Sequence, residues 1–285
     1  MISLFRRPQE GVRAITSHTA GDALGLLAQS PALNALAGAR LEEIRSSLTL
    51  GREFSGLFTG GEITAVLWHG VSLSLYGSVS PAELDALADR ALMRNPRFSS
   101  ITGDSAAVRD LFTRLRDRIQ KPRDERWRQP LLAASAAPQC LLSEELRPAR
   151  PQESELVYPA AVAMFIEEVG VDPTRFDGGR SYRARVQQMI RERRTYIVRR
   201  GDELVFKADV GALFQNTAQI HGVWTDPAHR GQGIAREAMA ALVPLVRADH
   251  ASEVTLYVND FNTPARRAYD AAGFRQVGEV ATLLF

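Results

Sequence analysis

The chain contains very little cysteine. Cys140 is the one cysteine among 285 residues, so an internal disulfide is excluded. Cys140 has no metal-ligand spacing around it, and the histidines and carboxylates are not grouped in the pattern of a metal site either. We therefore expect a protein of a reducing compartment that binds no metal.

Long apolar runs and an excess of one charge are also missing. No segment reaches the roughly 20 consecutive apolar residues of a membrane-spanning helix, and residues 1–10 lack the apolar core of a secretory signal. The 35 Lys and Arg residues nearly balance 33 Asp and Glu residues, for a formal net charge of +2. The sequence thus predicts a cytoplasmic protein with no membrane or nucleic-acid partner.

The length of the chain and a proline-interrupted segment in its middle predict two modules. A chain of 285 residues exceeds the usual size of one domain. Residues 121–144 are charged at first, then rich in alanine, and are interrupted by prolines, which is typical of a linker. We expect an N-terminal α/β module at 1–120, a linker at 121–144 and a C-terminal domain at 145–285.

The N-terminal module shows alternating strand and helix patterns without a phosphate-loop motif. Gly60-Gly61 predicts a hairpin, and Ser80-Pro81 predicts a helix start. The module is interpreted as a scaffold or partner surface, with substrate binding as the alternative, and it could be a degenerate relative of the second module. The predicted elements are strands at 53–58, 63–68, 72–76 and 98–101, and helices from 80 and over 105–118.

A glycine-rich turn follows an apolar run in the second half of the chain. Its sequence is Arg230-Gly231-Gln232-Gly233-Ile234-Ala235. Glycine lets the backbone turn sharply and approach a ligand closely, and the helix that begins here offers unpaired N–H groups to an anion. Arg230 adds a cation. Taken alone, the turn fits a plain strand-to-helix connection as well as a phosphate-binding loop, and the second motif decides between the two interpretations.

A second motif lies about thirty residues further on. It runs Asn262-Thr263-Pro264-Ala265-Arg266-Arg267-Ala268-Tyr269 and is followed by Gly273-Phe274. Asn262 can cap a helix, Pro264 suits the first turn, and Gly273 can end the helix. Two motifs in this order and at this spacing are stronger evidence for a protein family than either motif alone.

These two motifs closely resemble the cofactor core of the GNAT superfamily of acyl-CoA-dependent N-acyltransferases. The family's first motif has Gln or Arg, two residues, Gly, one residue, then Gly or Ala, which correspond here to Arg230, Gly233 and Ala235. Its second motif has Asn, then Ala, Tyr and Gly-Phe three, seven and eleven residues on, which correspond to Asn262, Ala265, Tyr269 and Gly273-Phe274. The resemblance covers roughly the second half of the chain. Residues 165–170 and 256–262 also resemble a bacterial two-module GNAT group with an uncharacterised N-terminal domain.

The resemblance implies an α/β (α+β) fold with a mixed, mostly antiparallel sheet flanked by helices. It implies an N-acetyltransferase with acetyl-CoA as co-substrate, and the acceptor stays open between a protein lysine or N-terminus and a small amine. A homo-oligomer is compatible with this prediction. The predicted elements of the C-terminal domain are strands at 146–151, 196–199, 203–210, 219–225, 253–258, 274–277 and 280–285, and helices at 160–169, 182–193, after 233 and after 262.

The resemblance also implies roles for individual residues. The backbone of Val223 and Thr225 corresponds to the groups that hold the acetyl carbonyl and the pantetheine arm. Tyr269 corresponds to the general acid for the departing thiolate. The positions expected at the CoA phosphates and the rest of the cofactor are Arg230, Gly231, Gln232, Gly233, Ile234, Ala235, Asn262 and Arg266.

The general base departs from the pattern of histone-type members. Their glutamate corresponds to Gln219, which is a poor proton acceptor. His221 follows two residues later and would share its face if no bulge intervenes. Glu167, Glu168 and a water relay are the other candidates. Because Gln219 replaces the base, a non-catalytic acyl-CoA sensor or regulatory protein is the alternative to an enzyme.

Overall fold

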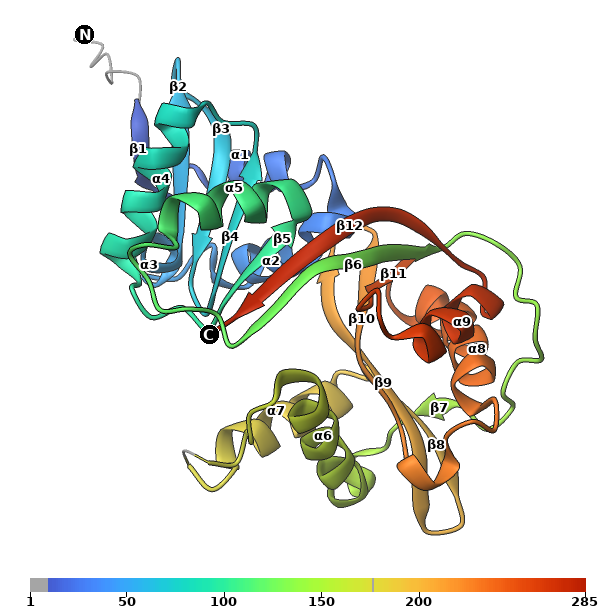
Figure 1. The fold of residues 1–285 in the computed structure, drawn as a ribbon. Helices are drawn as coiled ribbons and strands as arrows, with labels where there is room; N and C mark the ends of the chain where they lie inside the picture. The colour runs from blue at the N-terminus through green and yellow to red at the C-terminus, as the bar shows by residue number, and fades with distance from the viewer. Residues whose placement is uncertain (1–9, 176) are drawn as a thin grey trace, which may run out of the picture. The chain divides into compact units, whose positions relative to one another are not determined.

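The computed structural model describes residues 10–175 and 177–285. The segment tested for a secretory signal lies almost entirely outside these residues. The chain forms two compact units, one holding residues up to 129 together with 279–285, the other holding 130–278. Strands β6 (Asp124–Ala134) and β12 (Phe274–Leu284) each contribute to both units (Figure 1).

The first unit is built on a sheet in the order β1-β2-β3-β4-β5 followed by the end of β12. Neighbours pair antiparallel, except that β4 and β5 are parallel. Val280 of β12 pairs with Asp104 of β5. The strands are β1 (Gly11–Ala14), β2 (Phe54–Thr59), β3 (Glu62–His69), β4 (Ser72–Gly77) and β5 (Ser100–Asp104).

Helices α4 and α5 carry their apolar residues into the core of this unit. Leu84, Leu87, Val108 and Leu111 lie in one buried cluster with residues of β3, β4 and β5. A capping box between Ser80 and Glu83 starts α4, as Ser80-Pro81 predicts. Strand β1 and the first three helices were not predicted from the sequence. The helices are α1 (Ala20–Leu27), α2 (Pro31–Ile44), α3 (Leu50–Glu53), α4 (Pro81–Arg94) and α5 (Ser105–Leu115).

The second unit holds a sheet in the order β6-β11-β10-β9-β8-β7. Its neighbours pair antiparallel, except that β10 and β11 are parallel. This confirms the predicted mixed, mostly antiparallel sheet. The further strands are β7 (Arg147–Pro148), β8 (Thr195–Arg200), β9 (Glu203–Phe214), β10 (Thr217–Thr225) and β11 (Glu253–Tyr257).

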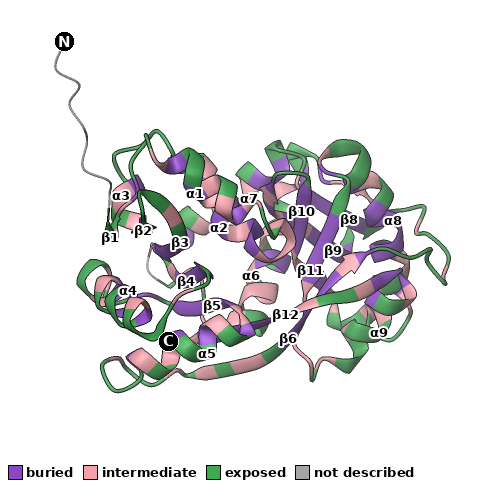
Figure 2. Ribbon diagram, turned by 90° about the horizontal axis from the view of Figure 1, so that it is seen from above, coloured by how far each residue is buried: buried purple, intermediate pink, exposed green. Residues whose placement is uncertain are grey.

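Helices cover both faces of this second sheet. Successive side chains of a strand point to opposite faces: Tyr196 and Val198 of β8 pack with α8 and α9, whereas Ile197 packs with α6 and α7. The buried residues accordingly follow the central strands in Figure 2. The helices are α6 (Ser154–Val169), α7 (Arg180–Arg191), α8 (Ile234–Asp249) and α9 (Thr263–Ala271).

Two stretches differ from the sequence prediction. Part of the expected linker is strand β6. Its Pro130 has no N–H to donate, but its carbonyl accepts the N–H of Val258 at 3.2 Å. The two expected final strands form one strand, β12, which passes through Gly278 without a break. Among the described residues, no helix is long and apolar enough to cross a membrane.

Candidate active site

Strands β10 and β11 separate after a short paired stretch. Their parallel pairing joins Thr217 to Glu253, Ala218 to Val254 and Gln219 to Thr255. Strand β10 then continues to Thr225 along β9, while its other side has no ladder partner among the described residues. Between residues 220 and 225, the backbone N–H groups that point away from β9 are therefore available to a ligand.

A bulge interrupts β10 at the open edge. The pairing with β9 shifts between Gln219 and Ile220 and again between His221 and Trp224. Gly222 has φ of +57°, which a glycine adopts without strain. Gly222 and Val223 have no partner in the register, so Val223, predicted to hold the acetyl carbonyl, lies where the backbone leaves the regular ladder.

A buried ion pair supports the bulge from β9. The side chain of Lys207 is 1% exposed, and its Nζ lies 2.6 Å from Asp209 Oδ2. The same Nζ donates to the Gly222 carbonyl at 3.0 Å, and Thr195 Oγ1 donates to Asp209 Oδ1 at 2.8 Å. Because C=O and N–H point in opposite directions in a trans peptide, this contact directs the Val223 N–H away from Lys207.

This pair was not predicted from the sequence. A lysine and an aspartate two residues apart share a face of a strand, and here they interrupt the apolar run from Leu204 to Val210. A lysine is rarely buried without a partner. That spacing was the available signal for a buried charge pair.

The glycine-rich loop has the backbone conformation that the sequence predicts. Gly231 and Gly233 have φ of +78° and +85°. Gly233 is the N-cap of α8, which begins at Ile234, and no side chain caps this helix start. Its first backbone bond runs from Glu237 N to Gly233 O at 3.2 Å, which leaves the preceding amides for an anion.

Two predicted site residues of this region bind each other. Arg230 Nη2 lies 2.8 Å and 3.1 Å from the two carboxylate oxygens of Glu167 on α6. Arg230 Nε also donates to the Thr225 carbonyl at 3.0 Å, and Trp224 Nε1 donates to Glu167 at 3.3 Å. The predicted phosphate ligand and one candidate base thus neutralise each other in this structure.

Tyr269 is buried on α9, at 7% exposure. Its ring packs against Phe274, with centroids 6.0 Å apart. Burial raises the pKa of Tyr269, and the negative charge of Glu168 raises it further. The hydroxyl is therefore protonated at neutral pH, and in the described part of the chain no side chain or backbone group binds it. It can donate a proton to an anion that forms beside it.

His221 lies beside Gln219 on the open edge. Its Nε2 is 2.9 Å from Gln219 Oε1, so the bulge does not separate the two side chains. Its ring makes an edge contact with Tyr257, at 5.9 Å between centroids, and it occupies space left by Gly211. Burial lowers the pKa of His221 to about 4, with a smaller contribution from Arg185 and an opposing one from Asp209. The imidazole is thus neutral at pH 7.

The second motif starts its helix as predicted. Asn262 Oδ1 accepts the N–H of Ala265 at 3.2 Å and caps α9. Arg266 Nη1 donates to the Asp260 carbonyl at 3.1 Å. The contacts of both residues with a cofactor stay predictions.

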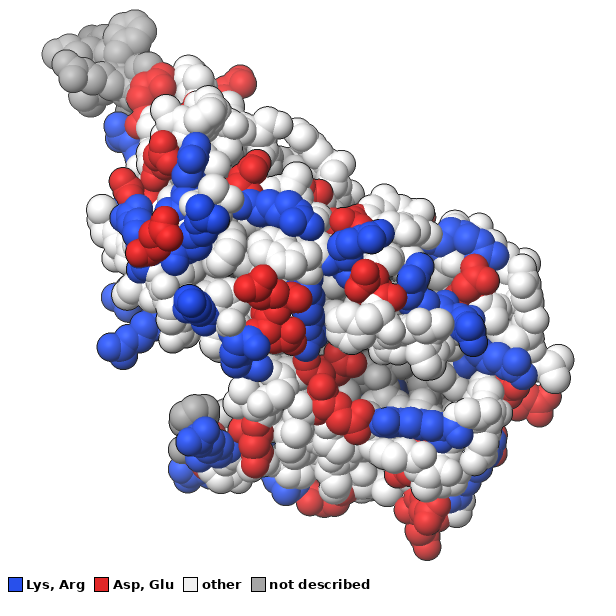
Figure 3. Space-filling model, in the orientation of Figure 1, with Lys and Arg blue, Asp and Glu red and all other residues white. Residues whose placement is uncertain are grey.

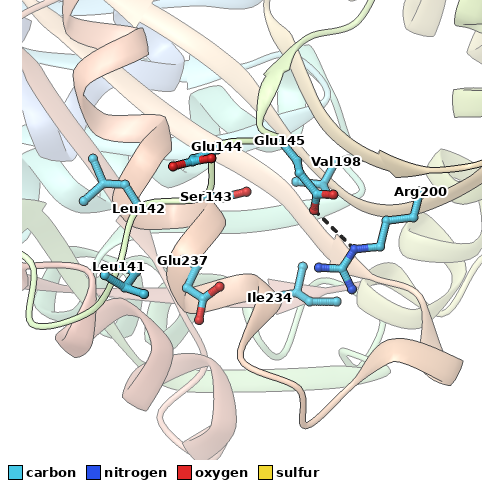
Figure 4. Close-up of a pocket in the computed structure, with 9 residues that line it drawn as sticks. All are labelled: Leu141, Leu142, Ser143, Glu144, Glu145, Val198, Arg200, Ile234 and Glu237. Atoms are coloured by element: carbon cyan, nitrogen blue, oxygen red, sulfur yellow. Dashed lines mark hydrogen bonds and ion pairs between the residues drawn. The ribbon is translucent and has the colours of Figure 1, made fainter.

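A small cavity lies beside the start of α8. It has a volume of about 240 Å³ and is bounded by the segment 141–145, β8 and α8 (Figure 4). Arg200 pairs with Glu145 across it at 3.2 Å, and Glu144 and Glu237 add negative charge. Ile234 is the one predicted site residue that lines it. Within the described ranges, no group of three or more His, Cys, Asp or Glu side chains could hold a metal ion.

Comparisons with known protein families divide the chain in two. Residues 164–274 match the model of the acetyltransferase (GNAT) family. Residues 52–157 match a domain of unknown function, DUF4081. A search of curated proteins gave no match.

Solved structures of similar fold cover nearly the whole chain. A GNAT-family acetyltransferase from Colwellia psychrerythraea has TM-score 0.61 at 11% identity, covering 96% of this chain and 99% of that one. A GCN5-related N-acetyltransferase from Sphaerobacter thermophilus has TM-score 0.57 at 21% identity, with coverages of 96% and 95%. A tandem GNAT protein from the clavulanic acid biosynthesis pathway has TM-score 0.53 at 13% identity, with coverages of 96% and 98%. At these identities the likeness is one of fold.

Proposed function

Because the chain carries a C-terminal domain of the GNAT acetyltransferase family behind an N-terminal DUF4081 domain, we propose that it transfers the acetyl group of acetyl-CoA to a primary amine. The observation that carries the proposal is the open edge of β10 together with the uncapped start of α8 in the same unit. The open edge of β10 can pair with the extended pantetheine arm of the cofactor. The free amides at the start of α8 can bind its phosphates.

The cofactor contacts follow from this arrangement. The amides from Gly231 to Ala235, with Gln232 among them, would bind the CoA phosphates at the positive end of α8. Val223 and Thr225 would pair with the pantetheine arm through their backbone. Asn262 and Arg266 at the start of α9 would complete the site, with Arg230 joining when Glu167 releases it.

The reaction is a direct attack of the amine on the thioester. The neutral amine nitrogen forms a bond to the carbonyl carbon, and the Val223 N–H, directed by the Lys207 contact, stabilises the negative oxygen that develops. The C–S bond then breaks, and Tyr269 gives its proton to the leaving thiolate. The amine gives up one proton, which restores the charge balance.

His221 is our first candidate to accept that amine proton. It lies on the open edge and is neutral at pH 7, both of which a base needs, although a pKa of about 4 makes it a weaker base than an ordinary histidine. Glu168 is the second candidate, because its charge acts on Tyr269. Glu167 is engaged by Arg230 and Trp224, which argues against it. A His221→Ala variant that keeps normal turnover across pH would assign the role to Glu168 or to a water relay.

The acceptor is proposed only as a primary amine, on a protein lysine or N-terminus or on a small molecule. The first experiment measures thiol release from acetyl-CoA with and without a pool of amines and lysine peptides. In Tyr269→Phe we expect kcat to fall about 10²-fold while acetyl-CoA affinity stays unchanged, because one proton-transfer group is lost.

Tyr196→Phe is the matched control. Tyr196 is a buried tyrosine of the same unit whose hydroxyl donates to Asp249 at 3.1 Å, far in the sequence from both motifs. Its loss should leave turnover unchanged. Full turnover in Tyr269→Phe would remove the general acid from the mechanism. Tight acetyl-CoA binding without acetylation of any amine would favour the sensor over the enzyme.

A further inference from the structure

The first unit contains a hollow that takes no part in the proposed acyl transfer. It has a volume of about 440 Å³, within the range of small-molecule sites. All of its lining residues belong to the first unit. Three arginines line it, one in α3 and two around the end of α4: Arg52, Arg94 and Arg97.

These three guanidinium groups are unpaired. Across residues 10–175 and 177–285, no carboxylate or other acceptor binds any of them. Many other arginines are paired with a carboxylate, and on the face in Figure 3 blue and red side chains are largely interleaved. Positive charge at the hollow is therefore left for an external anion.

The one carboxylate in the lining does not cancel this charge. Glu53 is held by Arg40, whose Nε and Nη2 lie 2.9 Å and 2.5 Å from its two oxygens. This contact lowers the pKa of Glu53. Arg40 also pairs with Glu43, so this cluster carries one net negative charge, which the three arginines outnumber.

The hollow is preformed by hydrogen bonds between its two walls. Asn95 Nδ2 donates to the Gly70 carbonyl, and Ser99 donates to the Val71 carbonyl through N and Oγ at 2.9 Å and 3.0 Å. The backbone of Arg97 binds Asn95 Oδ1 at 3.1 Å. The loop that carries Arg97 is thus tied to the turn between β3 and β4, which reduces the ordering cost of binding.

The turn is crowded at Gly70. A Cβ on Gly70 would lie 2.6 Å from Trp68 Nε1 and 2.8 Å from Glu53 Oε2. The lining also includes His69, which is 1% exposed and whose Nε2 lies 2.9 Å from Ser55 Oγ. Burial, with the charges of Arg90 and Arg94, lowers the pKa of His69 to about 4, in keeping with a positive local field.

We propose that the hollow lined by Arg52, Arg94 and Arg97 binds a small molecule that carries phosphate groups. Guanidinium groups bind phosphate oxygens through two parallel N–H donors. Three cations match a ligand with two or more negative charges, and the hollow has room for a small molecule. The near-zero net charge of the whole chain disfavours a nucleic acid. This site belongs to the DUF4081 match and is separate from the acyl-transfer chemistry.

The test is calorimetric titration of the full chain with pyrophosphate, in the presence of saturating coenzyme A to occupy any phosphate site on α8. We expect one saturable binding event. The triple variant Arg52→Gln/Arg94→Gln/Arg97→Gln should weaken it at least tenfold, because the phosphates lose three charged donors. The control Arg45→Gln/Arg109→Gln/Arg116→Gln removes the same charge from exposed arginines of the same unit and should bind as the parent does.

Three results would overturn the proposal. One is equal affinity in the triple variant and the control. Another is the absence of saturable pyrophosphate binding, including the case in which only a single-stranded oligonucleotide binds. The third is pyrophosphate binding that coenzyme A abolishes and that the triple variant leaves unchanged. Circular dichroism and thiol release from acetyl-CoA show whether the variants are folded, so a failed acyl-transfer assay in the parent is distinguished from a failed phosphate site.

Discussion

The two units of this protein treat their charged groups differently. In the second unit the charges near the open edge are paired: Lys207 with Asp209 inside the sheet, and Arg230 with Glu167 at the glycine-rich loop. In the first unit the three arginines of the hollow have no partner in the part of the chain that the structure describes. A paired buried charge fixes backbone geometry, whereas an unpaired exposed charge is available to a ligand.

Removing Lys207 should have the largest effect on stability and on turnover. In Lys207→Met we expect the free energy of unfolding to fall by about 3–5 kcal/mol, because Asp209 loses the cation of a buried pair. We also expect kcat to fall at least tenfold, because the Gly222 carbonyl loses the donor that directs the Val223 N–H. Urea unfolding and thiol release measure the two effects.

Two controls separate stability from positioning. Lys207→Met/Asp209→Leu removes both charges and should recover most of the stability while kcat stays low. Arg183→Met breaks the exposed pair with Glu155 and should change stability far less than Lys207→Met does, because water screens exposed charges. If Lys207→Met is as stable and as active as the parent, the buried pair does not organise the open edge.

Each unit contains one histidine with a lowered pKa, so the stability of both units should depend on pH. His69 and His221 are each held neutral, with a pKa of about 4. Each unfolded histidine takes up a proton below its ordinary pKa of about 6.5. The stabilisation that these two neutral histidines give to the folded state is therefore fully present above about pH 6.5 and is lost as pH falls toward 4. Below pH 4 these two groups cause no further change. Each histidine should contribute a loss of about 2–3 kcal/mol.

Urea unfolding at pH 7, 5.5 and 4 measures this loss. His69→Gln and His221→Gln should each flatten the dependence, because glutamine does not titrate. His18→Gln, at an exposed histidine, is the control and should leave the slope unchanged. A parent-like slope in both buried variants would show that other groups govern the acid response.

Local features of both units were predictable from the sequence. The positive φ of Gly231 and Gly233, the cap at Asn262 and the capping box at Ser80 each depend on residues within a few positions. Helix α2 was not predicted, because its buried residues include small ones such as Ala35, Ala37 and Gly38, which give little apolar contrast.

Contacts that depend on strand register were not predictable. Lys207 reaches Gly222 across 15 residues, and Arg230 reaches Glu167 across 63. Nothing in one sequence specifies that β10 shifts its pairing with β9 twice, which is what brings the Gly222 carbonyl to the buried lysine. The site residues themselves were found through a motif. The groups that orient them, Lys207 and Glu167, could be identified only from the structure.

The smallest expected effect concerns the Arg230–Glu167 pair. Unlike the arginines of the hollow, Arg230 is bound to a carboxylate. Both side chains are about half exposed, at 48% and 45%, so the pair contributes under about 1 kcal/mol. In Glu167→Gln, Arg230 no longer has a competing carboxylate and is free for the CoA phosphates. We expect the Kd for acetyl-CoA to fall two- to fivefold, with a steeper dependence on salt. Titration at low and high salt measures both, and Glu155→Gln removes an equivalent exposed charge as the control. A higher Kd in Glu167→Gln would mean instead that Glu167 positions Arg230 for the cofactor, in which case the second unit uses its pairing to build the phosphate site as well as the open edge.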